Sequence, residues 1–323
     1  MTISFRVLLA SLALSTCVCA QAQSTKIYRV GVIHAGGPYY HAVEGLRDAL
    51  KELGLEEGKQ YIFHVRDTKG DLKAAEEAGR ALENEKVDVI FSVPASVSVA
   101  AKRGTVKVPI VFFGGSDPVQ SGLVKSFARP EGRVTGIYSL TADLTGKRLE
   151  LLKEISPKLH SVMTFYNPDN PVVGESVQSA RDAARQLGVT LIERQVRSRE
   201  ELQVQLRELK RADTDALFLV SDQTIQSQAK LIIDAANAQK LPTMFYDRSL
   251  VIDGGLASYG VSYYAIGQLA AKYVRRVLLG TVPADLPVER SERFELYLNA
   301  RTARAIGVTF PRVVLGRADE VVE

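Results

Sequence analysis

The chain repeats its own sequence pattern at long range. Three short motifs occur once in each half, in the same order, at residues 46–49 and 180–183, 87–91 and 214–218, and 108–113 and 241–246. The two copies of each motif lie 127 to 134 residues apart. This period is far longer than the 20–50 residues of a solenoid or propeller unit. The repeat therefore predicts two similar lobes, one after the other, with a cleft between them.

Short apolar runs alternate with segments of helical pattern in both halves. We expect strands at 27–33, 61–65, 87–93, 108–113, 161–166, 189–195, 216–220, 243–246, 256–259 and 294–298. We expect helices at 38–53, 72–82, from about 96, and at 172–187, 199–209, 223–239, 263–279 and 300–306. This alternation is typical of an α/β protein with doubly wound parallel sheets.

The chain lacks a long glycine- and serine-rich linker, which favours lobes joined by several short crossings. We expect residues 26–137 plus about 257–284 in an N-terminal lobe. Residues 138–256 plus about 285–323 then form a C-terminal lobe.

The first 22 residues have the pattern of a secretory signal peptide. Arg6 precedes an apolar run at 7–14, and Ala20-Gln21-Ala22 is an A-x-A cleavage site, so we expect cleavage after Ala22. The run is too short to span a membrane. Export to the periplasm follows, with a lipid anchor on Cys17 as an alternative. Both cysteines of the chain lie in this segment, so the mature protein has no disulfide and no thiolate chemistry.

Composition and motifs argue against several classes of function. The chain is 46% hydrophobic and 24% charged, with a net charge of +4, and its basic residues are scattered among acids. A nucleic-acid-binding surface would need clustered basic residues. The four histidines lack metal-ligand spacing, and no nucleophile elbow, phosphate-binding loop or dinucleotide fingerprint is present. We therefore expect no catalysis, no cofactor, no metal and no membrane-spanning segment.

Polar and aromatic residues follow the predicted strands, at the edge where ligands bind in open α/β sheets. Helix N-termini at this edge suit the anionic end of a small ligand, and Asp117 or Asp222 would pair with an ammonium group. Tyrosines offer flat faces for stacking. Helix capping and simple packing are the structural alternatives for the same residues. The candidate ligand-binding residues are Ala35, Gly36, Tyr39, Ser96, Ser116, Asp117, Asn167, Asn170, Asp222, Tyr246 and Tyr259.

Several longer blocks resemble the ABC transporter substrate-binding proteins of the tryptophan/tyrosine type. The blocks lie at residues 115–124, 128–136, 146–154, 166–171, 254–260, 294–307 and 317–321, so the resemblance covers essentially the whole mature chain. It implies a type I periplasmic-binding-protein fold with a hinge, and partners in an ABC permease and its ATPase. It also implies a cleft lined by Ser96, Ser116 and Asp117 on the first lobe and by Asn167, Asn170 and Asp222 on the second. Tyr246 and Tyr259 would then lie near the hinge.

The function expected from these patterns is the capture of a small solute between the lobes and its delivery to an ABC importer. An aromatic amino acid is the favoured ligand, and a branched amino acid, a sugar or another carboxylate stays open. Two alternatives use the same fold. One is a ligand-sensing module that docks on a membrane signalling receptor, and the other is a secreted enzyme.

Overall fold

The structure is a computed structural model that describes residues 26–170, 173–226 and 228–323. The predicted signal peptide and the candidate anchor Cys17 lie outside the described residues. Within the described ranges, no helix is both long enough and apolar enough to cross a membrane.

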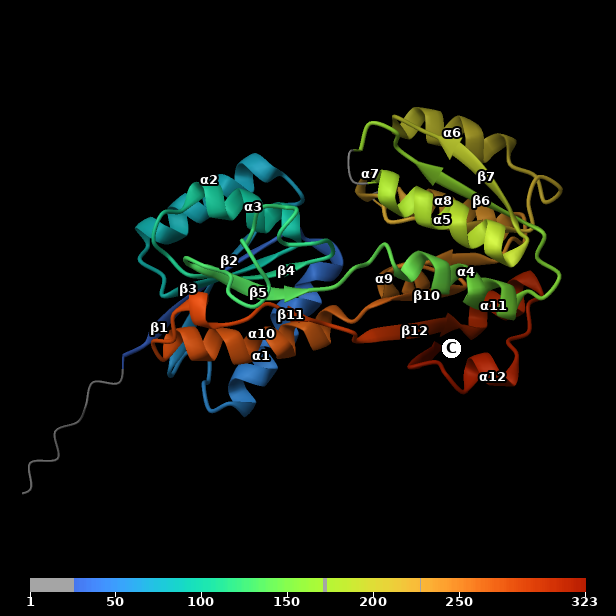
Figure 1. The fold of residues 1–323 in the computed structure, drawn as a ribbon. Coiled ribbons are helices and arrows are strands. Elements are labelled where there is room, and N and C mark those ends of the chain that lie inside the picture. The colour runs from blue at the N-terminus through green and yellow to red at the C-terminus, as the bar shows by residue number, and fades with distance from the viewer. Residues whose placement is uncertain (1–25, 171–172, 227) are drawn as a thin grey trace, which may run out of the picture.

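The first lobe is a parallel sheet with helices on both faces (Figure 1). Its strand order is β11-β5-β4-β3-β1-β2. The strands are β1 (Tyr28–His34), β2 (Tyr61–Asp67), β3 (Val89–Val93), β4 (Ile110–Gly114), β5 (Val134–Tyr138) and β11 (Glu289–Arg290). The helices are the short η1 (Gly37–Tyr39) and η2 (Pro283–Asp285), with α1 (Tyr40–Glu52), α2 (Leu72–Asn84), α3 (Ala95–Gly104) and α10 (Tyr263–Leu278). Helices α1 and α10 cover one face, and α2 and α3 cover the other.

The second lobe is built in the same way, with the strand order β13-β12-β10-β9-β8-β6-β7. The strands are β6 (Ser161–Tyr166), β7 (Thr190–Gln195), β8 (Ala216–Phe218), β9 (Thr243–Phe245), β10 (Ala257–Val261), β12 (Phe294–Asn299) and β13 (Glu320–Val322). The helices are α4 (Leu144–Ile155), α5 (Val173–Leu187), α6 (Arg199–Glu208), α7 (Gln223–Gln226), α8 (Ala229–Ala238), α9 (Arg248–Ile252), α11 (Ala300–Ile306) and α12 (Arg312–Leu315). All strand pairs are parallel except β10 with β12.

The internal repeat is confirmed by the order of the strands. The series β5-β4-β3-β1-β2 in the first sheet matches β10-β9-β8-β6-β7 in the second, strand for strand. The repeated motifs fall at corresponding places in this series, in α1 and α5, around β3 and β8, and around β4 and β9. The prediction of two doubly wound α/β lobes is therefore correct.

Three segments connect the lobes, and two of them differ from the boundaries expected from sequence. The chain crosses from β5 to α4, returns from β10 to α10, and crosses again from β11 to β12 (Figure 1). Residues 257–261, expected in the first lobe, form β10 and pair with β9 and β12 in the second sheet. Residues 289–290, expected in the second lobe, pair with β5 in the first. Residues 257–261 belong to the second lobe because β10 is the last strand of the second repeat, in the same position that β5 has in the first.

Other differences arise where the sequence pattern is weak. Strand β5 was not expected, because Gly136 lies at its centre and glycine weakens a strand pattern. A Cβ atom on Gly136 would come within 2.1 Å of the Phe112 carbonyl oxygen, so the close approach of β5 to β4 requires glycine. The helix expected at 223–239 is two helices, α7 and α8, and residue 227 between them lies outside the described residues.

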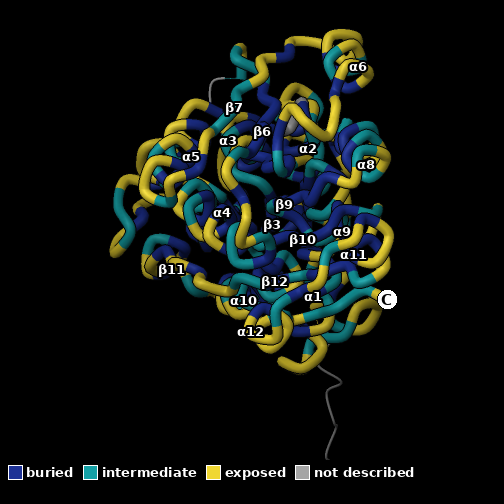
Figure 2. Tube along the Cα trace, turned by 90° about the vertical axis from the view of Figure 1, so that its right-hand side faces the viewer, coloured by how far each residue is buried: buried dark blue, intermediate teal, exposed yellow. Residues whose placement is uncertain are grey.

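Each lobe has its own hydrophobic core on both faces of its sheet. Figure 2 shows buried residues along the strands and exposed residues on the outer sides of the helices. In the first lobe, one cluster joins the sheet to α1 and α10, and a second joins it to α2 and α3. The second lobe has two comparable clusters. Because the cores are separate, the crossing segments and the residues at the facing strand ends connect the lobes.

Candidate functional site

An aromatic cluster lies where the two lobes meet. The ring of Tyr39, in η1, packs edge-on against Tyr263, the first residue of α10, with ring centroids 4.9 Å apart. Phe113, in β4, contacts the same ring at 6.1 Å. Burial raises the pKa of Tyr39 to about 12. Tyr246 follows β9 in the second lobe. Burial raises its pKa well above the ordinary value, and the neighbouring Tyr39 and Asp247 raise it further.

Tyr39, Tyr246 and Tyr263 are named the tyrosine cluster below. All three residues are partly buried, with Tyr39 and Tyr263 packed against the core of the first lobe and Tyr246 against that of the second, so the cluster joins the lobes where they meet. Tyr39 and Tyr246 were predicted site residues, and Tyr263 was missed. Its position at a crossing segment, directly after the β10 motif, is the sequence signal that indicates it.

The second lobe gathers four predicted site residues into one hydrogen-bonded group. Asp222, which follows β8, is 2% exposed. Its carboxylate accepts hydrogen bonds from the Asn167 backbone N–H at 2.6 Å and from Asn170 Nδ2 at 3.1 Å. The Tyr246 hydroxyl donates to the Asp222 carbonyl oxygen at 3.4 Å. The loops after β6, β8 and β9 are thus held together around one buried carboxylate.

The first-lobe candidates are more exposed and more local in their contacts. Ala35 donates its backbone N–H to Val93 at 3.2 Å, which ties the loop after β1 to β3. Gly36 has a positive φ of 78° and precedes η1, the helix that carries Tyr39. Ser116 is exposed, and Asp117 Oδ1 accepts from the backbone N–H groups of Val119 and Gln120 at 2.7 and 3.1 Å. These contacts hold the conformation of the loops that follow β1 and β4 in the first lobe.

Ser96 does not cap α3 in the way its sequence position suggests. The helix begins at Ala95, its N-cap residue is Pro94, and Ser96 is an exposed residue of the first turn. Ser98, one turn into the helix, donates its hydroxyl to the Pro94 carbonyl oxygen at 3.0 Å. The hydroxyl of Ser96 therefore has no capping role.

Tyr259 lies apart from the tyrosine cluster. Its ring is 6.1 Å from Phe294 in β12, and it packs against the second-lobe core. Burial raises its pKa, and its charged neighbours are Lys147, Asp319 and Arg317. The described contacts of Tyr259 are thus with the hinge strands of the second lobe.

The structure adds a residue that the sequence interpretation did not single out, Arg148 in α4. Its guanidinium is 0% exposed. Nε donates to the Leu144 carbonyl oxygen at 3.3 Å, and Nη2 donates to the Thr141 carbonyl oxygen at 3.0 Å and to the Thr145 hydroxyl at 3.3 Å. Nη1 has no hydrogen-bond partner among the described residues. The guanidinium carbon lies 5.8 Å from the centre of the Tyr246 ring. Burial lowers the Arg148 pKa to about 10, so the group stays charged at pH 7.

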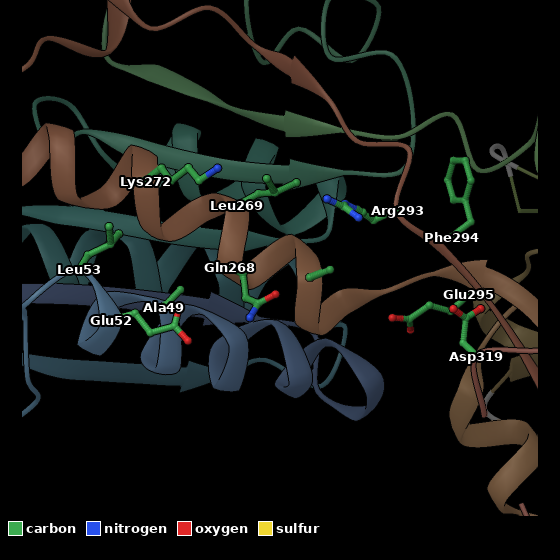
Figure 3. Close-up of a pocket in the computed structure, with 11 residues that line it drawn as sticks. Ala49, Glu52, Leu53, Gln268, Leu269, Lys272, Arg293, Phe294, Glu295 and Asp319 are labelled. Carbon is green, nitrogen blue, oxygen red and sulfur yellow. The ribbon is translucent and has the colours of Figure 1, made fainter. Parts of the chain in front are cut away.

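Among the hollows bounded by described residues, two lie beside the hinge. The larger, of about 480 Å³, is bounded by α1, α10 and the start of β12 (Figure 3). Lys272 and Arg293 extend toward each other across it. The second, of about 240 Å³, is lined from both lobes by residues that include His41, Asp247 and Tyr263. Burial raises the pKa of Asp247, the residue that caps α9. None of the predicted site residues lines either hollow.

The described residues contain no group of three or more histidine, cysteine, aspartate and glutamate side chains that could hold a metal ion.

Comparisons with known proteins agree with this architecture. The profile of the family described as ABC transporter substrate binding protein matches residues 29–322. A tyrosine-binding protein from Clostridioides difficile is 27% identical over 82% of this chain and 76% of its own length. A solved conserved domain protein from Vibrio cholerae is 30% identical, covers 92% of this chain and all of its own, and has a TM-score of 0.80.

A solved ABC domain from Streptococcus pneumoniae, in complex with L-Trp, also has a TM-score of 0.80, with 23% identity over 92% of this chain and 100% of its own. The two-lobed architecture is also that of solved periplasmic-binding and LacI-type proteins, and it confirms the predicted type I fold.

Proposed function

This chain belongs to the family of ABC transporter substrate-binding proteins, and we propose that it captures an aromatic amino acid between its lobes and delivers it to an ABC importer. The family consists of substrate-binding proteins, not enzymes.

Three kinds of chemical group lie close together where the lobes meet, and this arrangement carries the proposal. The tyrosine cluster offers aromatic faces and hydroxyls. The buried Asp222 group offers a carboxylate and amides, and Arg148 offers a cation. Aromatic rings favour edge-on or offset contact with another ring, and a carboxylate favours an ammonium group. Together these groups complement a zwitterion that carries an aromatic side chain.

The similar proteins support the same ligand class. One relative is a tyrosine-binding protein, and one structure of the same fold is a complex with L-Trp. We carry the aromatic amino acid over to this chain as part of the proposal.

The mechanism is a shift between open and closed arrangements of the lobes. The ligand-facing residues lie on both lobes, and the three crossing segments act as the hinge. A ligand touches both sets of residues only when the lobes approach each other, so it stabilises the closed state. The closed form would then dock on a permease driven by an ATPase. A periplasmic location follows from the predicted signal peptide.

Thermal unfolding against a ligand panel tests the proposal. The mature protein, refolded free of carried-over solute, is heated with tryptophan, tyrosine, phenylalanine, branched amino acids, sugars and small acids. A ligand at about 100 times its Kd should add about 2.7 kcal/mol of stability, which raises the Tm by several degrees. We expect this shift with at least one aromatic amino acid. A shift only with another class would discard the aromatic ligand, and a panel without any shift would contradict small-solute capture.

A further inference from the structure

We propose that Arg148 binds the carboxylate of the solute and so makes this protein selective for ligands with a free acid group. The inference deepens the proposed function and rests on it. Arg148 is fully buried, and one nitrogen of its guanidinium has no hydrogen-bond partner among the described residues.

The position of Arg148 places it between the lobes. It lies one turn into α4, the first helix after the crossing from β5, and it holds the Thr141 carbonyl oxygen of that crossing segment. Tyr246 of the second lobe lies against its guanidinium. Tyr263, at the start of the returning helix α10, is close enough to raise the pKa of the Arg148 guanidinium, although burial lowers it more. Arg148 thus lies against the tyrosine cluster where the lobes meet.

The hydrogen bonds of Arg148 leave one guanidinium nitrogen without a partner among the described residues. Nε and Nη2 donate to two carbonyl oxygens and one hydroxyl, whereas Nη1 is buried without a partner among the described residues. A buried donor without a partner is costly, and it calls for a group that the protein itself does not supply.

The charge of Arg148 also has no acidic partner in the part of the chain that the structure describes. None of the ion pairs found among the described residues includes it, and its electrostatic neighbours are the hydroxyls of Tyr246 and Tyr263. Arg133, the comparable arginine of the first lobe, also donates to backbone carbonyl oxygens but lies near the Glu83 carboxylate. A buried cation is strongly disfavoured without an anion. A ligand carboxylate supplies that anion, and arginine binds carboxylates with charge-assisted hydrogen bonds.

Calorimetry with matched ligand pairs tests this inference. L-tyrosine and L-tryptophan are each compared with their carboxamides, which keep the ring and the ammonium group but lose the negative charge. The parent protein should bind each acid at least about tenfold more tightly than its amide. Arg148→Gln should weaken the acids at least about tenfold and leave the amides nearly unchanged, so that the preference disappears. Arg148→Lys, which keeps the charge, should restore part of it.

Arg185→Gln is the control, because it removes an exposed arginine on α5 that pairs with Asp182, three residues earlier in the same helix. It should retain the full preference for the acid. If Arg148 only holds the crossing segment in place, Arg148→Gln would weaken acid and amide equally, and that result would overturn the inference. Equal affinity of the parent protein for acid and amide would do the same, even if Arg148→Gln failed to fold.

The outcomes also separate this inference from the proposed function. If the parent protein binds a non-aromatic carboxylate instead, and prefers it to its amide through Arg148, the aromatic ligand fails while the role of Arg148 stands. If an aromatic amino acid binds without any acid preference, the proposed function stands and the inference fails. If no carboxylate binds, both are overturned.

Discussion

Replacing Gly267 by alanine should lower the free energy of unfolding by about 3 kcal/mol. Gly267 lies in α10 where this helix crosses α1. A Cβ atom there would come within 2.0 Å of the Ala42 carbonyl oxygen and 2.6 Å of the Leu46 backbone nitrogen. Both atoms belong to the backbone of α1, so a side-chain rotation cannot relieve the contact. The helices must separate and lose part of the packing that holds α10, which returns from the second lobe, onto the first.

Gly174→Ala is the matched control for this prediction. Gly174 lies in the first turn of α5 and is exposed, and a new Cβ there would meet no other part of the described chain within 4 Å. Alanine at this site should stabilise the protein by up to about 1 kcal/mol, because glycine costs backbone entropy in a helix. Urea unfolding of both variants compares the two effects. A Gly267→Ala protein as stable as its parent would contradict the close crossing of α1 and α10.

Replacing Asp222 by alanine should weaken ligand binding at least about tenfold, which corresponds to about 1.4 kcal/mol. The carboxylate joins the loops after β6 and β8 through Asn167 and Asn170, and it faces the same region as Tyr246. Alanine removes the buried acceptor of two donors and also the negative charge that we propose for the ligand ammonium group. The cost of leaving buried donors without a partner is about 1–3 kcal/mol. Calorimetry of the refolded protein measures the loss of affinity.

Two further variants test the reason for this loss. Asp222→Asn removes the charge and keeps one of the two acceptor oxygens, so it should preserve one of the two loop hydrogen bonds and still bind the amino acid weakly. Asp169→Ala removes an exposed carboxylate of the neighbouring loop, which pairs with Arg197 at 3.5 Å, and it should leave the affinity almost unchanged. An Asp222→Ala protein with the affinity of its parent would remove Asp222 from the site.

Much of the fold could be predicted because the sequence repeats. The apolar strands before Pro94 and Tyr246 are recognisable by their runs of buried residues, and the repeat places them at corresponding positions in two sheets. Strand β5 could not be recognised because Gly136 interrupts its pattern, although close contact with Phe112 requires that glycine. The lobe boundaries were displaced because no local pattern shows which sheet an edge strand joins. Only pairing partners, such as β9 and β12 for β10, decide this.

The candidate site was predictable where it depends on strand ends. Asn167, Asn170 and Asp222 follow adjacent parallel strands, and the structure brings them into one hydrogen-bonded group. Arg148 is recognisable in the sequence as a charged residue that shares the apolar face of α4 with Leu144 and Leu152. A charged residue on such a face is unusual. Whether it has a counter-charge depends on distant parts of the chain, so its significance appears only when its neighbours are known.

Small-angle X-ray scattering with and without ligand tests the central claim most directly, that the lobes close around a solute. The measurement uses the mature protein, refolded free of solute, and then saturated with the aromatic amino acid that stabilises it most in thermal unfolding. A smaller radius of gyration in the saturated protein is the result that the hinge and the two-sided site predict. Identical scattering curves at a ligand concentration that calorimetry shows to be saturating would contradict closure.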